Sequence, residues 1–152
     1  MKATRLLACV DGSAEALQAA RLAFALAAEW GATVRAISVV DDADLALLEP
    51  VTAQRATLQE RLRQAGQATL AHVEEMGRAA GVVTQPVLAV GNPFEKILDE
   101  ARHWQPDFIF MGRTGRRGPG RVLVGSETER VLEFTSWPVV VVPRETPTTR
   151  PV

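Results

Sequence analysis

The sequence contains one cysteine, Cys9, so no disulfide can form within the chain. It has no apolar run that approaches the ~18 residues of a membrane-spanning helix. Acidic and basic residues nearly balance, with 17 Lys and Arg against 18 Asp and Glu and a net charge of −1. A dedicated nucleic-acid-binding domain is usually strongly basic, so this balance argues against one. The chain opens without a signal-peptide pattern, and we expect a soluble cytoplasmic protein with no membrane or nucleic-acid partner.

Two well-known phosphate-binding motifs are also missing. The chain has no G-x-x-x-x-G-K-[S/T], which excludes a Walker-type NTPase, and no G-x-G-x-x-G dinucleotide fingerprint after its first apolar segment. Its two histidines, His72 and His103, fall in predicted helices and have no ligand partner at metal-binding spacing. Local sequence therefore offers neither a zinc site nor a nucleophile paired with a base.

The sequence does contain a regular alternation of apolar strands and amphipathic helices. Hydrophobic residues make up 47% and charged residues 23% of its 152 residues, the balance of an ordinary globular domain. Strands are predicted at 4–10, 33–40, 82–90, 107–111 and 139–142, and helices at 14–30, 54–80, from Pro93 onward and at 126–134. Residues 43–53 fit either a short helix or a loop. Pro86 lies inside the third predicted strand, which indicates an edge strand.

This alternation predicts an α/β fold in which helices cover both faces of a parallel sheet. We expect residues 1–143 to form a single domain. The tail at 144–152 is polar and rich in proline, so we expect it to be disordered. Cys9 falls within the first predicted strand, where a lone cysteine is expected to serve packing.

A glycine-rich segment, residues 112–126, lies between the fourth predicted strand and the last predicted helix. It reads G-R-T-G-R-R-G-P-G-R-V-L-V-G-S. Glycines let a ligand approach the backbone, and unpaired N–H groups at the start of a helix favour an anion such as phosphate. Four arginines precede the first acid, Glu127: Arg113, Arg116, Arg117 and Arg121. This local positive charge indicates a phosphorylated ligand.

Each of these features also has a purely structural explanation. Glycine-rich loops are often only turns, and Ser126 with Glu129 matches a capping box that would stabilise the helix. The acidic cluster that begins at Asp41 fits a solvated turn as well as a group that assists a divalent ion on a phosphate. Ligands of open parallel sheets bind beyond the carboxyl ends of the strands. Because Asp11, Asp41 and the glycine-rich segment all follow strands, we expect them to converge on one crevice.

The glycines are spaced as glycine, two residues, glycine, nine residues, then glycine and serine, at Gly112, Gly115, Gly125 and Ser126. In this spacing the chain resembles the universal stress protein family, whose nucleotide-binding pattern it matches without insertion or deletion. The resemblance covers nearly the whole chain. It includes the opening strand that ends in Asp11, the D-F-I-F-M-G of the fourth strand and the closing P-V-V-V-V-P.

The resemblance implies an open, doubly wound five-stranded parallel sheet of strand order 3-2-1-4-5, similar to the adenine nucleotide alpha hydrolases, and usually a homodimer. In the family's ATP-binding branch, adenine lies near the ends of the first two strands, and the ribose and phosphates lie against the glycine-rich segment. Carried over to this sequence, the nucleotide-binding residues are Val10, Asp11, Val39, Met111, Gly112, Arg113, Gly115, Gly125, Ser126, Glu127 and Thr128. Magnesium or manganese often accompanies the phosphates, and Asp11 or Asp41 could bear on such an ion through them.

Glu127 departs from the family pattern, because the residue at this position is commonly small and apolar. A carboxylate beside a triphosphate is repulsive unless an arginine or a metal offsets it. AMP or another nucleotide of lower charge therefore stands beside ATP as a candidate ligand.

The last predicted strand, residues 139–142, consists of four valines. In the implied strand order it is outermost, and an uncovered valine edge invites pairing with a second copy of the chain. The flanking residues Pro138 and Pro143 offer an alternative, because prolines alone can protect an edge.

Three functions are compatible with these residues. The first is a stress-response module whose bound ATP biases conformation or the choice of partner. The second is a slow ATPase or a phosphoryl or adenylyl transferase, for which only Asp11 and Asp41 are evident as a general base. The third is a dimeric interaction domain that binds no nucleotide. The glycine-rich segment and its arginines favour the first.

Overall fold

The computed structural model describes residues 2–114 and 124–144, and within these residues five parallel strands form one sheet in the order β3-β2-β1-β4-β5. The strands are β1 Arg5–Cys9, β2 Thr33–Asp41, β3 Thr84–Gly91, β4 Phe108–Gly112 and β5 Val139–Val142. The α/β class and the strand order implied by the family resemblance are confirmed. β3 is an edge strand, as Pro86 indicated. The predicted tail beyond Arg144 lies outside the described residues.

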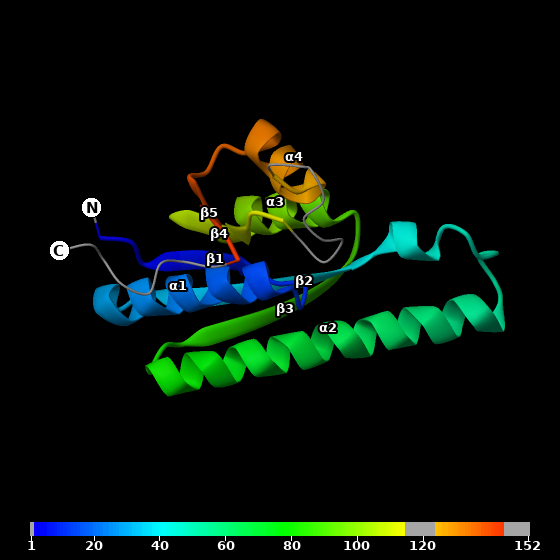
Figure 1. Ribbon diagram of the computed structural model, residues 1–152, viewed down its shortest axis with the longest axis horizontal. Helices are drawn as coiled ribbons and strands as arrows, with labels where there is room; N and C mark the ends of the chain where they lie inside the picture. Colours follow the sequence, from blue (N-terminus) through cyan, green and yellow to red (C-terminus); the bar gives the residue numbers. More distant parts are fainter. Residues whose placement is uncertain (1, 115–123, 145–152) are drawn as a thin grey trace.

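Helices cover both faces of the sheet (Figure 1). They are α1 Ala14–Trp30, the 3₁₀-helix η1 Asp42–Leu45, α2 Ala53–Ala80, α3 Pro93–Trp104 and α4 Ser126–Phe134. One core cluster joins the sheet to α1 and α2, and a second joins the opposite face to α3 and α4. Cys9 is buried in the second cluster, as expected, and burial raises the pKa of its thiol well above the ordinary range.

Caps explain where the helices begin and end. Ser13 begins α1, with its side chain accepting a hydrogen bond from the Ala16 N–H, and Gly31 ends the helix at a φ of 67°. Gly81 ends α2 in the same left-handed conformation, at a φ of 70°. The next amide, that of Val82, donates back to the Gly77 carbonyl at 2.9 Å, so Val82 completes the end of the helix. β3 therefore begins at Thr84 and not at Val82, where the sequence predicted it.

The first half of α2 extends beyond the sheet (Figure 1). The helix has 28 residues and is about 42 Å long at ~1.5 Å per residue. Its fully buried residues, Leu70, Val73 and Gly77, all lie in its second half. Residues 43–53, which the sequence allowed as either a short helix or a loop, form most of η1 and a connection to α2. Arg55 stabilises this connection by donating to the Leu45 and Leu48 carbonyls. No helix of the described chain combines the length and the apolar character that crossing a membrane requires.

Candidate functional site

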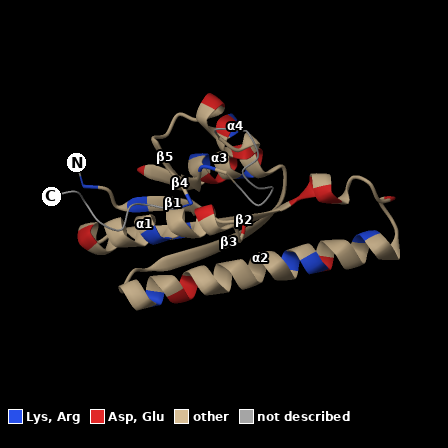
Figure 2. Ribbon diagram, in the orientation of Figure 1, with Lys and Arg blue, Asp and Glu red and all other residues tan. Residues whose placement is uncertain are grey.

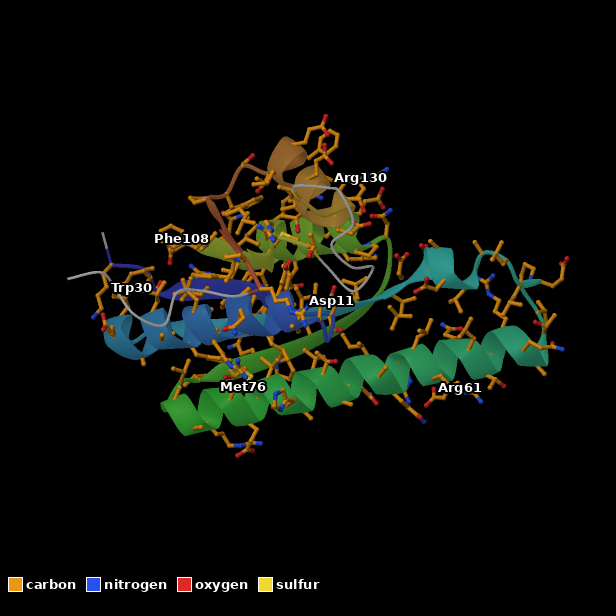
Figure 3. The ribbon with its side chains drawn as sticks, in the orientation of Figure 1. Asp11, Trp30, Arg61, Met76, Phe108 and Arg130 are labelled. Atoms are coloured by element: carbon orange, nitrogen blue, oxygen red, sulfur yellow. The ribbon has the colours of Figure 1, made fainter. Side chains whose placement is uncertain are left out.

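A cavity of about 820 Å³ lies at the carboxyl edge of the sheet. Its walls include the ends of β1, β2 and β4, the first turns of α1 and α4, and the middle of α2. In Figure 3, the labelled Asp11 marks this edge of the sheet and lies between α4 and α2. The volume falls within the ~300–1,000 Å³ of ordinary small-molecule sites. The predicted convergence on one crevice is therefore observed for Asp11, Asp41 and the described ends of the glycine-rich segment.

Most of the predicted nucleotide-binding residues line this cavity. They are Val10, Asp11, Val39, Met111, Gly112, Gly125, Ser126, Glu127 and Thr128. Arg113 does not line it; its side chain is half exposed and its Nη2 lies 3.8 Å from Oε1 of Glu15. Gly115 lies outside the described residues, as do the other arginines of the segment: Arg116, Arg117 and Arg121.

Gly112 ends β4 directly against the first turn of α1. A Cβ atom at this position would lie 2.9 Å from the backbone nitrogen of Ala16 and 2.9 Å from the carbonyl carbon of Glu15. Backbone atoms cannot move aside as a side-chain tip can, so only glycine permits this approach. The carbonyl of Gly112 also accepts a hydrogen bond from the Thr128 hydroxyl at 2.9 Å, which ties α4 to β4.

The contact between Glu15 and Thr114 was not predicted from the sequence. Glu15 is 5% exposed and Thr114 is 4% exposed. Oε2 of Glu15 accepts hydrogen bonds from both the backbone N–H and the hydroxyl of Thr114. The amide of Gly125 donates to the Arg113 carbonyl at 2.7 Å, so the two ends of the glycine-rich segment are held together. An acid in the first turn of a helix is common, because it interacts favourably with the helix dipole. The sequence therefore does not identify Glu15 as a buried contact.

The first turn of α4 forms another part of the wall. Gly125 is the N-cap and Ser126 is the first helical residue, with no side-chain capping bond. The predicted capping box of Ser126 with Glu129 is therefore wrong, because a residue that is already helical is one position too late to cap. The first amides of a helix have no carbonyl partner within it, and its dipole is positive at this end. This end of α4 can therefore stabilise an anion.

Glu127, the second residue of α4, is held at the start of another helix. Its Oε2 accepts a hydrogen bond from the backbone N–H of Phe94 at 3.1 Å, in the first turn of α3. Phe94 in turn stacks on Phe134 and lies under the guanidinium of Arg130, whose Cζ is 5.2 Å from the ring centroid. Glu127 thus connects α4 to α3 at the rim of the cavity.

The two aspartates at the strand ends make local turn contacts. Oδ1 of Asp11 accepts from the Ser13 amide at 2.9 Å, and Oδ1 of Asp41 accepts from the Ala43 amide at 2.9 Å. Asp41 is 8% exposed and caps η1, so the interpretation as a solvated turn is wrong for this residue. Across the described residues, no three His, Cys, Asp or Glu side chains are grouped so that they could hold a metal ion. These residues do not fit an ion held by the protein itself.

The wall contributed by α2 was not predicted. Leu62, Ala65, Gly66 and Thr69 line the cavity. Leu62, Ala65 and Thr69 continue the helical spacing of Val73, which is buried in the core, so the sequence does not distinguish them from core residues. Because α2 extends beyond the sheet (Figure 1), they line the cavity instead.

An open parallel sheet with a cavity at its carboxyl edge is the arrangement in which α/β proteins commonly bind small molecules. The chain belongs to the universal stress protein family, whose family model matches residues 2–143. Universal stress protein MJ0531 of Methanocaldococcus jannaschii is 37% identical over 132 residues, which cover 87% of this chain and 77% of that protein.

Solved structures share the fold. Protein MJ0577 matches with a TM-score of 0.85 at 24% identity, over 97% of this chain and 100% of that one. A universal stress protein in complex with cAMP matches with a TM-score of 0.70 at 18% identity, over 95% and 100% of the two chains. The universal stress protein of Archaeoglobus fulgidus in complex with dAMP matches with a TM-score of 0.66 at 19% identity, over 93% and 99%.

Proposed function

We propose that this universal stress protein binds an adenine nucleotide in the cavity, with ATP as the expected ligand, and acts as a regulatory module in the stress response. One observation carries the proposal: strand ends and the first turn of α4 surround a space of about 820 Å³. A cavity of this size and an anion-favouring helix start suit a ligand with a flat base and a phosphate. Family members in complex with cAMP and dAMP support the same ligand class.

The lining divides into an apolar and a polar part. Val10, Val39 and Met111 offer apolar surface at the ends of three strands, where the adenine would lie. Asp11 would hold the adenosine part. The phosphates would lie at Gly112 and at the start of α4, and we include Arg113 and Gly115 among the phosphate contacts. A magnesium or manganese ion would be held chiefly by those phosphates, since the described residues supply no ligand cluster of their own.

The proposal can be tested by filling the adenine side of the cavity. Val39→Trp should block ATP binding, because Val39 lines the cavity and its side chain is half-buried. Val90→Trp is the matched control: Val90 lies in the neighbouring strand, paired with Val40, and its side chain is 43% exposed. Binding is measured by calorimetry and by the rise in melting temperature, which reflects about 2.7 kcal/mol at a ligand concentration of 100 Kd.

We expect the wild type and Val90→Trp to bind and Val39→Trp to lose binding. Arg113→Glu should weaken ATP more than adenosine, because it reverses a charge near the phosphates. Full binding by Val39→Trp would place the ligand elsewhere. A wild type that binds none of ATP, ADP, AMP or cAMP would exclude the nucleotide function.

We also propose a homodimer that forms through the outer edge of β5, Val139–Val142, the last strand in the order of the described sheet. The Ile109 amide donates to the Pro138 carbonyl and the Arg113 amide donates to the Val142 carbonyl, so alternate peptide groups face β4. The peptide groups of Val139 and Val141 then face outward, where a partner strand could pair with them. Val141→Pro removes one outward N–H and leaves the bonds to β4 intact.

Light scattering after gel filtration should find a wild-type dimer and a monomeric Val141→Pro variant. The melting temperature of the variant provides the folding control. A monomeric wild type, or a variant that remains a dimer, would refute the β5 interface.

The compartment that we propose is the cytoplasm, since a free buried thiol such as Cys9 is typical of reducing surroundings.

A further inference from the structure

The charge of the cavity wall differs from what the sequence indicated. The described residues that line it include four acids and no Lys or Arg. Asp11 and Asp41 lie at the strand ends, and Glu127 and Glu129 lie in the first turn of α4. α4 carries three glutamates, Glu127, Glu129 and Glu133, against one arginine, Arg130 (Figure 2). A polyphosphate placed against this turn would meet carboxylates from the same helix whose amides attract it.

Glu127 cannot turn away from the cavity without losing a contact. Its Oε2 is fixed by the Phe94 amide at 3.1 Å, and the residue is only half exposed. Arg130, one turn along α4, lies over the Phe94 ring. None of the ion pairs among the described residues includes Glu127. Its negative charge is therefore held at the rim rather than neutralised by a neighbouring basic side chain of the described chain.

Two opposing effects act on a phosphorylated ligand at this place. The first amides of α4 attract the phosphate that reaches them, and this attraction falls off within one turn of the helix. Repulsion by Glu127 acts on every negative charge of the ligand within a Debye length, ~10 Å at 0.1 M salt. One phosphate gains the full attraction, whereas each further phosphate adds mainly repulsion. A divalent ion bound to the phosphates reduces this repulsion by lowering the charge of the ligand.

We propose that Glu127 makes the cavity select among adenine nucleotides by charge, so that a nucleoside monophosphate or a metal-complexed nucleotide binds in preference to free ATP. This selection rests on the proposed nucleotide function and adds a specificity-determining residue to it. The hydrogen bond to Phe94 keeps the selecting charge in place.

Glu127→Gln tests the proposal, because the glutamine amide oxygen can still accept from the Phe94 N–H while the charge is gone. Glu133→Gln is the matched control, since Glu133 lies exposed on the same helix and does not line the cavity. The ligands are adenosine, AMP, ADP and ATP, titrated by calorimetry in EDTA, with ATP repeated in excess Mg²⁺. Each series is measured at 50 and 500 mM salt, chosen to span weak and strong screening.

We expect Glu127→Gln to strengthen free ATP binding about tenfold and AMP binding about threefold, while adenosine binding is unchanged. The gain should shrink at high salt and with Mg²⁺, and Glu133→Gln should show none of it. Nucleotide binding whose dependence on ligand charge is the same in the wild type and Glu127→Gln would refute the selection while leaving the nucleotide site intact. Absence of binding by any ligand would instead refute the site itself.

Discussion

The contact between Glu15 and Thr114 is expected to be one of the most important for holding the cavity together. In Glu15→Ala, the backbone N–H and the hydroxyl of Thr114 both lose their acceptor inside the protein. An unsatisfied buried donor costs about 1–3 kcal/mol, although the hydroxyl can rotate toward another acceptor and the removal of a buried charge offsets part of the loss. We expect a net destabilisation of about 2–4 kcal/mol.

The loss can be measured by urea and by thermal unfolding. At about 2–4 °C per kcal/mol for a chain of this size, a loss near 3 kcal/mol lowers the melting temperature by about 6–12 °C. Glu15→Gln keeps one acceptor oxygen and should lose only about 1 kcal/mol. Thr114→Val removes the hydroxyl while its backbone N–H remains.

A double-mutant cycle isolates the contact itself. Glu15→Ala and Thr114→Val should be non-additive by about 1 kcal/mol or more, as expected of residues in direct contact. Glu100→Ala is the control: Glu100 pairs with Arg35 at 2.6 Å and does not line the cavity. Its effect should add to that of Thr114→Val. Additive losses from Glu15→Ala and Thr114→Val, or a Glu15→Ala variant within about 0.5 kcal/mol of the wild type, would refute the role given to Glu15.

Three further predictions concern other parts of the chain. Gly112→Ala should cost about 1–3 kcal/mol in urea unfolding because its Cβ would meet the backbone of α1, whereas Gly66→Ala, which meets the movable tip of Leu88, should be neutral or stabilising. The backbone amides of Thr4 and Arg5 lower the pKa of Asp107, so its stabilisation is present above pH ~4 and lost as the pH falls through the lowered value. Asp107→Asn should therefore cost about 1 kcal/mol at pH 7 and progressively less as the carboxyl becomes protonated in acid; an equal loss at pH 7 and in acid would contradict this. Cys9 should react with a thiol reagent much more slowly in the native protein than after unfolding, since it is 8% exposed at the cavity wall and burial raises its pKa; equally rapid labelling of both states would contradict this.

Local sequence signals located the strands and α-helices of the described chain, apart from the start of β3, but did not decide between a helix and a loop for residues 43–53. The predicted helices 14–30 and 54–80 are observed to within one residue, because Ser13, Gly31 and Gly81 cap them and such caps depend on a few neighbouring residues. The strand order came from the family resemblance and not from periodicity, since apolar runs alone do not say which strands are neighbours. The class of ligand likewise depended on the spacing of the glycines.

The parts of the site that could not be predicted depend on contacts between distant segments. Glu15 and Thr114 are 99 positions apart, and only the approach of β4 to α1 brings them together. The apolar spacing of α2 continues past the end of the sheet. The sequence therefore does not show that Leu62 lines a cavity and is not part of the core. Ser126 was misassigned because a shift of one residue separates an N-cap from a first helical position.

The cavity residues that match the family pattern act in two different ways, and this decides how mutations there should be interpreted. Gly112 is required by its distance from α1, and the Thr128 hydroxyl already donates to the Gly112 carbonyl. Substitution of either residue disturbs the wall itself, so a loss of ligand binding in such a variant would not identify a ligand contact. Val39 and Ser126 line the same cavity from a half-buried and an exposed position, with no such internal role among the described contacts. Variants at these two residues therefore distinguish a nucleotide site from a well-packed loop.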